Sequence, residues 1–299
     1  MKPALRSRLC AALAIVAVVL VTPALADKMP VEGAELVYLS DGEGQPIVFV
    51  HGSISDHRVW EPMRETITKK HRYVAYDQRY FGEAEWPDVP ERFANQTHVN
   101  DLIAFIEGLD SGPVDVVTWS YSGVIGIKAA LARPDLIRAL IHYEPSFSGP
   151  ITSLPGAKAA RSEYIGLFGP GIKAMRSDDL EAASLRLLEG VFRMPEGTAE
   201  NEPERWQAIW KVNGRTLPLM FGSDNGAPVT CDDLARLDKP TLVVTGSNTI
   251  IYWTMIGEQI AQCQPNALHL VMEGVNHDGP YREPQKFAAM INDFLNLVD

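Results

Sequence analysis

The segment VVTWSYSG, residues 116–123, carries most of the information about the fold. Its first residues form an apolar, β-branched run that is typical of a buried strand. The residues that follow, 122–132, favour a helix, so Ser120 lies in the turn between the two. An isolated serine in such a turn usually caps the helix. The surrounding sequence therefore decides whether Ser120 does more than that.

Short apolar runs alternate with helix-length stretches on both sides of this segment. Strands are expected over residues 35–39, 47–50, 72–76, 114–118, 140–143, 241–245 and 268–272. Helices are expected over about 58–70, 97–109, 122–132, 253–263 and 284–297. Such alternation predicts an α/β class protein with a mostly parallel, doubly wound sheet.

The alternation stops between residues 146 and 238. This stretch contains helical patterns around 157–168, 179–192 and 203–212, joined by turns that carry Gly and Pro. We expect a helical cap inserted into a core made of residues 27–145 and 239–299. Most of its aromatic side chains are expected to form the insertion's own core.

The first 26 residues have the pattern of an export signal. Lys2, Arg6 and Arg8 precede an apolar run at 9–21, and the triplet at 24–26 is Ala-Leu-Ala. The run is short of the roughly 20 residues that a membrane-spanning helix needs. We therefore expect a signal peptide over 1–26, a secreted or periplasmic mature protein and no stable membrane anchor.

The composition describes a globular and acidic protein. The chain has 299 residues, 46% of them hydrophobic, and a formal charge of −11, which becomes −14 once the three cations of the leader are removed. So negative a protein repels phosphate backbones, and no basic patch is visible, so we expect no nucleic-acid partner. The oligomeric state is not encoded in any pattern that we can identify.

Two cysteines remain after the leader, Cys231 and Cys263. In an oxidising compartment they could form a disulfide, or they could stay as free thiols, and the sequence leaves both open. Neither has a His or Cys neighbour at metal-ligand spacing, and no phosphate-binding glycine loop is present. We expect no metal and no cofactor.

Three further segments match a known pattern in their order along the chain. VFVHGS at 48–53 ends an apolar strand in His-Gly, YDQRYFG at 76–82 follows another strand, and EGVNHDGPYREP at 273–284 contains His277. Together with VVTWSYSG they resemble the α/β-hydrolase fold superfamily, in its serine hydrolase branch. The resemblance covers nearly all of the chain after the leader.

The resemblance implies a set of site residues. Ser120 would be the nucleophile and His277 the general base, and the backbone amides of Ser53 and Tyr121 would bind the oxyanion. The family usually has glycine two positions to either side of the nucleophile, and this chain has Thr118 and Ser122 there. Trp119 and Trp253 are expected to contact the substrate.

The acid of the triad is missing from its usual place. Family members carry it in the turn after the strand that corresponds to 241–245, where this chain has Thr249. Glu144 directly follows the strand 140–143, so it lies at the active-site edge of a parallel sheet, and some lactonases and haloalkane dehalogenases of the family place their acid there. We favour the triad Ser120, Glu144 and His277 over a degenerate one. Asp278 is too close in sequence to reach the ring, and the more distant alternatives are Asp56, Asp224 and Asp233.

These residues predict an exported serine hydrolase, similar to esterases and lactonases, that cleaves a carboxylic ester or lactone of a small apolar substrate through an acyl-enzyme. A carbon–carbon bond hydrolase or a cofactor-free perhydrolase would use the same triad. A catalytically inactive relative that binds a hydrophobic ligand, with Thr249 marking the lost acid, and a protein-interaction scaffold also remain open.

Overall fold

The computed structural model describes residues 26–86, 89–223 and 225–298. The expected signal peptide, apart from its last residue, and Asp224 lie outside the described residues. The described chain forms an eight-stranded sheet in the order β1-β2-β4-β3-β5-β6-β7-β8. The six strands from β4 to β8 in this order run parallel, whereas β1 pairs antiparallel with β2, and β2 with β4. The predicted α/β class with a mostly parallel sheet is confirmed.

The strands are β1 Asp27–Val31, β2 Ala34–Asp41, β3 Pro46–Val50, β4 Arg72–Tyr76, β5 Val114–Trp119, β6 Ile137–Tyr143, β7 Thr241–Gly246 and β8 Ala267–Met272. Every residue of β3, β5 and β7 is buried. This burial fits their largely apolar sequences, because a central parallel strand is covered by helices on both faces. The helices of the core are α1 Arg64–Ile67, α2 Asn95–Gly108, α3 Ser122–Ala132, α9 Cys231–Ala235, α10 Ile251–Cys263, α11 Gly279–Arg282 and α12 Pro284–Val298.

The helix expected over 58–70 is wrong. The structure has two short 3₁₀ turns, His57–Val59 and Glu61–Met63, followed by the single-turn helix α1. Pro62 lies inside the second turn, and proline removes the amide hydrogen that a continuous α-helix would need. The Asp56 side chain also accepts from the Arg58 amide and starts a separate turn there.

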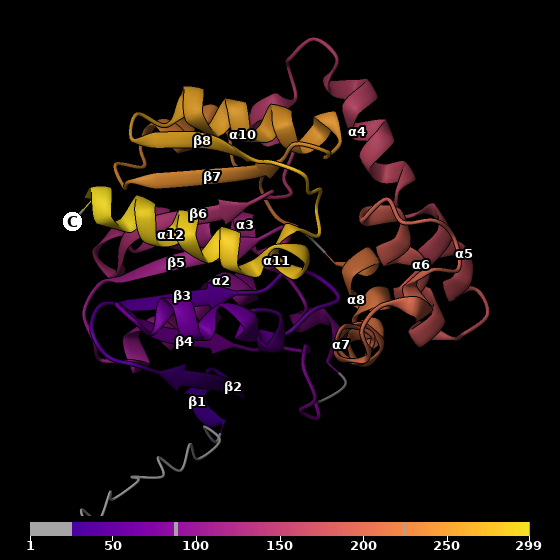
Figure 1. Ribbon diagram of the computed structural model, residues 1–299, viewed down its shortest axis with the longest axis horizontal. Coiled ribbons are helices and arrows are strands. Elements are labelled where there is room, and N and C mark those ends of the chain that lie inside the picture. The colour runs from indigo at the N-terminus through magenta and orange to yellow at the C-terminus, as the bar shows by residue number, and fades with distance from the viewer. Residues whose placement is uncertain (1–25, 87–88, 224, 299) are drawn as a thin grey trace, which may run out of the picture.

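Between β6 and α9 the described chain forms the helices α4 Ala157–Gly166, α5 Gly169–Met175, α6 Leu180–Val191, α7 Glu204–Asn213 and α8 Leu217–Gly222. They gather beside one end of the sheet, on the right in Figure 1. In the described part of the chain this segment adds no strand to the sheet. We call these helices the cap.

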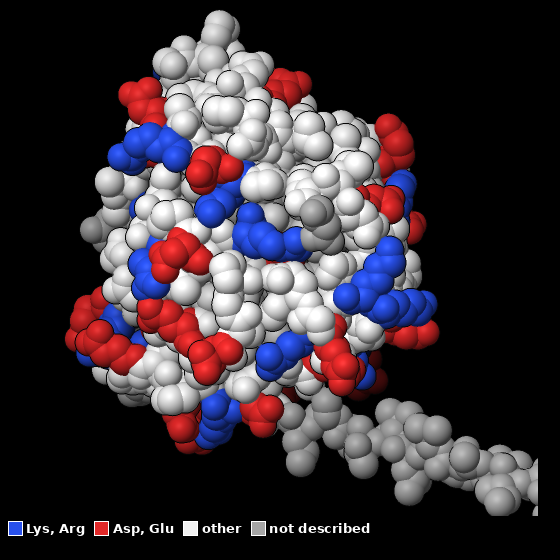
Figure 2. Space-filling view, turned by 90° about the vertical axis from the view of Figure 1, so that its left-hand side faces the viewer, with Lys and Arg blue, Asp and Glu red and all other residues white. Residues whose placement is uncertain are grey.

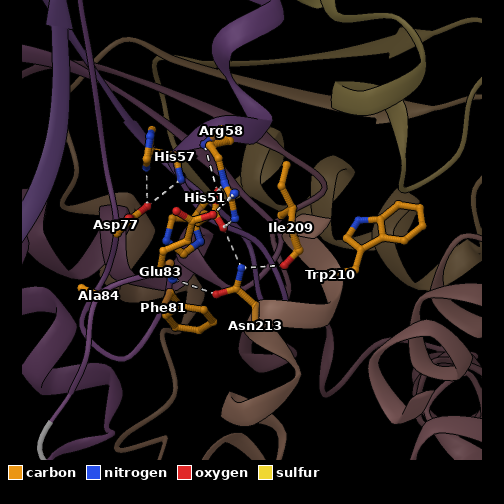
Figure 3. A network of polar contacts seen from close by, with 12 residues as sticks. His51, His57, Arg58, Asp77, Phe81, Glu83, Ala84, Ile209, Trp210 and Asn213 are labelled. Atoms are coloured by element: carbon orange, nitrogen blue, oxygen red, sulfur yellow. Dashed lines mark hydrogen bonds and ion pairs between the residues drawn. The ribbon is translucent and has the colours of Figure 1, made fainter. Parts of the chain in front are cut away.

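Asn213, at the end of α7, fastens the cap to the core (Figure 3). The side-chain Nδ2 of Asn213 donates to Asp56 Oδ2 at 2.8 Å, and its side-chain Oδ1 accepts from the Gly82 amide at 2.8 Å. Asn213 and Asp56 are both fully buried. Burial matters here because a buried polar group that loses its partner costs more than an exposed one.

Asn213→Ala is expected to lower the free energy of unfolding by about 2–3 kcal/mol, since it leaves buried polar atoms of Asp56 and Gly82 without this partner. Chemical denaturation measures the change. Asn100→Ala, at an exposed site on α2, is the matched control and should change stability by less than about 0.5 kcal/mol. Equal stabilities for the two variants would contradict this role of Asn213.

Cys231, at the start of α9, and Cys263, at the end of α10, form a disulfide with 5.2 Å between their Cα atoms. The bond resolves the alternative that the sequence leaves open. It joins two residues 32 positions apart, and the segment between them includes β7 and the turn containing Thr249.

The surface carries mixed charge. On the face shown in Figure 2, acidic and basic side chains are interspersed and form no continuous basic patch. Among the described residues, no helix has the length and apolar character that crossing a membrane requires.

Candidate active site

Ser120 occupies a sharp turn between β5 and α3. Its φ is +56°, in the left-handed region, which is unfavourable for a residue other than glycine and costs of the order of 1–3 kcal/mol. The turn is held by surrounding bonds: the Ser120 amide donates to the Tyr143 carbonyl at 3.0 Å, and the Ser122 hydroxyl donates to the Val50 carbonyl at 2.8 Å. A Cβ at Gly123 would lie 2.3 Å from Pro145 Cβ, so any side chain at this position would clash with the loop after β6.

Glu144 and His277 are brought together by the ends of β6 and β8. Glu144 Oε2 lies 2.7 Å from His277 Nδ1, and the two side chains are 0% and 2% exposed. Glu144 has a φ of +42°, so the chain turns sharply after β6 and directs this side chain toward the histidine loop. With Nδ1 carrying the hydrogen that faces a carboxylate, Nε2 is left with a lone pair that can accept a proton.

Thr249 hydrogen-bonds to Glu144. Its hydroxyl donates to Glu144 Oε2 at 3.0 Å, and the Gly246 amide donates to Glu144 Oε1 at 2.7 Å. Together with His277, three donors therefore satisfy a carboxylate that has no contact with water. The β7 turn, which carries the acid in the resembling family, here supplies two of these donors.

Aromatic side chains fix the imidazole ring. Trp253 stacks on His277 with 3.8 Å between ring centroids and 10° between planes. Trp119 donates from its indole nitrogen to the His277 carbonyl at 3.1 Å. The stacking holds one face of the imidazole, and the second contact holds the backbone of His277. The ring therefore has little freedom to move away from the Glu144 carboxylate.

Ser120 and His277 line the same cavity, which has a volume of about 340 Å³. Its wall includes both proposed oxyanion residues, Ser53 and Tyr121, and both predicted substrate contacts, Trp119 and Trp253. The cap contributes Tyr164, Phe168, Leu188 and Phe192, among others. Among the described residues, Arg161 of α4 is the one Lys, Arg, Asp or Glu side chain in the lining.

The amides of Ser53 and Tyr121 are available to a ligand. Neither N–H has a hydrogen-bond acceptor within the described residues, although both lie next to the cavity. Tyr121 precedes α3, so its amide also lies at the positive end of that helix. His51 stabilises the adjoining loop, as its ring bonds to the Gly52 carbonyl at 2.7 Å and accepts from the Gln78 amide at 3.0 Å. Burial lowers the pKa of His51, so it stays neutral.

Ser120 has a different hydrogen-bond partner from the expected one. Ser120 Oγ hydrogen-bonds with Ser146 Oγ at 3.2 Å, and no hydrogen bond joins it to His277 among the described residues. Such catalytic bonds are often long or misaligned before substrate binds. Sequence reasoning missed Ser146, although its position two residues beyond Glu144, at the carboxyl end of β6, was a usable signal.

The other candidate residues lie elsewhere. Asp56 binds Arg58 and Asn213, and Asp278 binds Arg282 at 2.8 Å. Asp233 pairs with the N-cap residue Thr230 in the capping box of α9. His142 is a core residue, hydrogen-bonded to Thr118 at 2.5 Å, and burial lowers its pKa to about 3.

One cluster has ligand types that suit a metal. Atoms of Asp56, His57 and Asp77 lie within 4.8 Å of one another. Arg58 pairs with both oxygens of Asp56, and His57 Nδ1 bonds to Asp77 at 2.7 Å (Figure 3). These hydrogen bonds occupy the carboxylate oxygens and the imidazole nitrogen that would have to bind a metal ion, so we assign no metal here.

Comparisons with known proteins agree with this fold. Residues 47–290 match the model of the family described as "Alpha/beta hydrolase family". A putative non-heme bromoperoxidase, BpoC, of Mycobacterium tuberculosis is 23% identical over 88% of this chain and 98% of its own length. The (E)-2-((N-methylformamido)methylene)succinate hydrolase of Acinetobacter baylyi is 21% identical over 87% and 94%. The solved enol-lactonase of Burkholderia xenovorans superposes with a TM-score of 0.70 at 19% identity, covering 90% of this chain and all of that one.

Proposed function

The chain belongs to the alpha/beta hydrolase family, and we propose that it is an exported serine hydrolase that cleaves a carboxylic ester or lactone of a small, largely apolar substrate. The observation that carries the proposal is the bond between Glu144 and His277, beside a serine in a strained turn and two amides without acceptors. An inactive relative that had lost its acid would not need a carboxylate bonded to the histidine beside this serine and these amides.

The reaction follows from the positions of the groups. Ser120 Oγ attacks the acyl carbon while His277 Nε2 takes its proton, and Glu144 stabilises the resulting imidazolium. The carbonyl oxygen becomes an oxyanion against the Ser53 and Tyr121 amides, which together stabilise the transition state by several kcal/mol. His277 then returns the proton to the leaving oxygen, and a water activated by His277 resolves the acyl-enzyme.

Two features support export. The first 26 residues have the composition of a signal peptide, and the Cys231–Cys263 disulfide suits an oxidising compartment. Mass determination of the N-terminus after expression with the full leader tests this part, and we expect the mature chain to begin at about Asp27.

An active-site phosphonate tests the chemistry. We expect a fluorophosphonate to label the wild-type protein at Ser120, and Ser120→Ala to remain unlabelled. A folded wild-type protein that is not labelled contradicts the proposal and favours a ligand-binding protein.

A panel of short esters, long esters, aryl esters and lactones then defines the substrate. It should include ester pairs that differ only in a distant carboxylate, because Arg161 lines an otherwise uncharged wall. Assays for carbon–carbon cleavage and for peracid formation distinguish the related reactions.

A further inference from the structure

Trp253, in the first turn of α10, lies flat against the imidazole of His277. The ring centroids are 3.8 Å apart, and the angle between the planes is 10°. Two other rings lie further from the imidazole and are tilted against it, Trp119 by 41° at 5.7 Å and Phe192 by 44° at 6.4 Å. Among the described residues, Trp253 is therefore the one aromatic ring that presents its face to the imidazole.

This stacking is an unfavourable arrangement for two uncharged rings. The face of an aromatic ring carries partial negative charge and its edge partial positive charge, so neutral pairs favour offset or edge-to-face geometries with centroids about 4.5–7 Å apart. A cation over the face of a ring is attracted instead, and tryptophan attracts it most strongly of the aromatic residues. The position of Trp253 thus suits a protonated His277 better than a neutral one.

Burial strengthens this preference. The side chain of His277 is 2% exposed and Trp253 is 1% exposed, so little water screens a charge on the imidazole. The Glu144 carboxylate bonds to Nδ1 at the edge of the ring, at 2.7 Å, and the indole covers a face. The two groups therefore act on the same positive charge from different directions.

Trp253 is held in this position by contacts of its own. Its indole N–H donates to Ser146 Oγ at 2.9 Å, and Tyr164 of cap helix α4 meets it edge to face at 5.5 Å. A group that is already in place when charge develops needs no rearrangement during the reaction, and its interaction then lowers the barrier directly.

His277 gains a positive charge when it takes the Ser120 proton. An interaction that favours the charged ring over the neutral one stabilises the transition state more than the ground state. We propose that Trp253 stabilises the imidazolium of His277 through the face of its indole, and so accelerates the attack by Ser120. The inference rests on the proposed function, because it needs His277 to act as the base.

Inactivation by a small alkyl fluorophosphonate measures this step without any knowledge of the substrate. Its saturation kinetics separate the first-order rate constant of inactivation from reversible binding of the probe. Trp253→Leu, which has no aromatic face, should lower the rate constant about ten- to thirtyfold, and Trp253→Phe, which keeps a weaker one, about three- to fivefold. Binding of the probe should change less than either rate constant.

Fluorinated tryptophans separate the electronic effect from the shape of the side chain. Fluorine withdraws electron density from the face of the indole and changes its size little, so mono-, di- and trifluorotryptophan weaken a cation–π interaction in steps. Incorporated at all six tryptophans of the chain, they should lower the rate constant stepwise, by about five- to tenfold over the series. The matched control is Trp253→Phe with the same labelling of the remaining tryptophans, whose rate constant should stay within about twofold.

A second background shows whether fluorine acts through the indole N–H. Ser146→Ala removes the acceptor of that N–H and leaves the stacking on His277 in place. The stepwise decrease should persist in this variant. If it disappears, the N–H and not the ring face carries the effect, and the inference is wrong.

The remaining outcomes separate the two proposals. A folded wild-type protein that is not labelled by the probe removes the proposed function, and this inference with it. Labelling at a rate that does not change with fluorine overturns the inference alone, because Trp253 would then only fix the position of the ring. An equal decrease in fluorinated Trp253→Phe overturns it as well, since another tryptophan would be responsible. Thermal unfolding of each variant shows that folded proteins are compared.

Discussion

Replacing Glu144 with Gln is expected to lower kcat/KM by about 10³- to 10⁴-fold. Glutamine has the size of glutamate, but its NH₂ group cannot accept from His277 Nδ1. An imidazole that faces this NH₂ turns to the other tautomer, with its hydrogen on Nε2, and loses the lone pair that takes the Ser120 proton. The variant also lacks the negative charge of the Glu144 carboxylate, which stabilises the imidazolium. Steady-state kinetics on the best ester of the panel measure the loss.

Thr249→Ala is the matched control for this prediction. It removes one of three donors to Glu144 and leaves the carboxylate bonded to Gly246 and His277. We expect a loss of less than about tenfold. If the two variants ranked in the opposite order, Thr249 and not Glu144 would orient the histidine.

Ser120→Ala and His277→Ala are each expected to lower kcat by about 10⁵- to 10⁶-fold, and the double variant should be no worse than either. The effects are not additive because neither group has a function without the other: the base has no proton to take, or the nucleophile has no base. The residual activity would come from the Ser53 and Tyr121 amides and from substrate binding. Losses that multiply in the double variant would mean that the two residues act in separate steps.

The sequence predicts those helices and strands that have a continuous pattern within their own residues. The helix expected at 122–132 and the strand expected at 72–76 match α3 and β4 residue for residue. Both have continuous sequence patterns with clear ends. β1 was not expected, since its sequence DKMPV is short and includes Pro30, and it is formed by pairing with β2.

The site shows the same division between local and tertiary information. Glu144 could be selected because a vacant acid position and a strand end were both visible in the sequence. The strand-end position of Ser146 was visible too, but its partners were not, because its contacts with Ser120 and Trp253 depend on how the loop after β6 packs against α10. The cap attachment through Asn213 is likewise a contact between residues 157 positions apart.

We propose that Glu144, at the end of β6, acts on His277 from the place in space that an acid in the β7 turn would occupy. Thr249 Oγ1 lies 3.0 Å from the Glu144 oxygen that binds His277. An aspartate at 249 in the Glu144→Gln background should therefore reach the same ring nitrogen. We predict that Glu144→Gln/Thr249→Asp recovers kcat/KM at least tenfold over Glu144→Gln alone. A double variant as inactive as a folded Glu144→Gln, or a Glu144→Gln variant with wild-type activity, would contradict the claim.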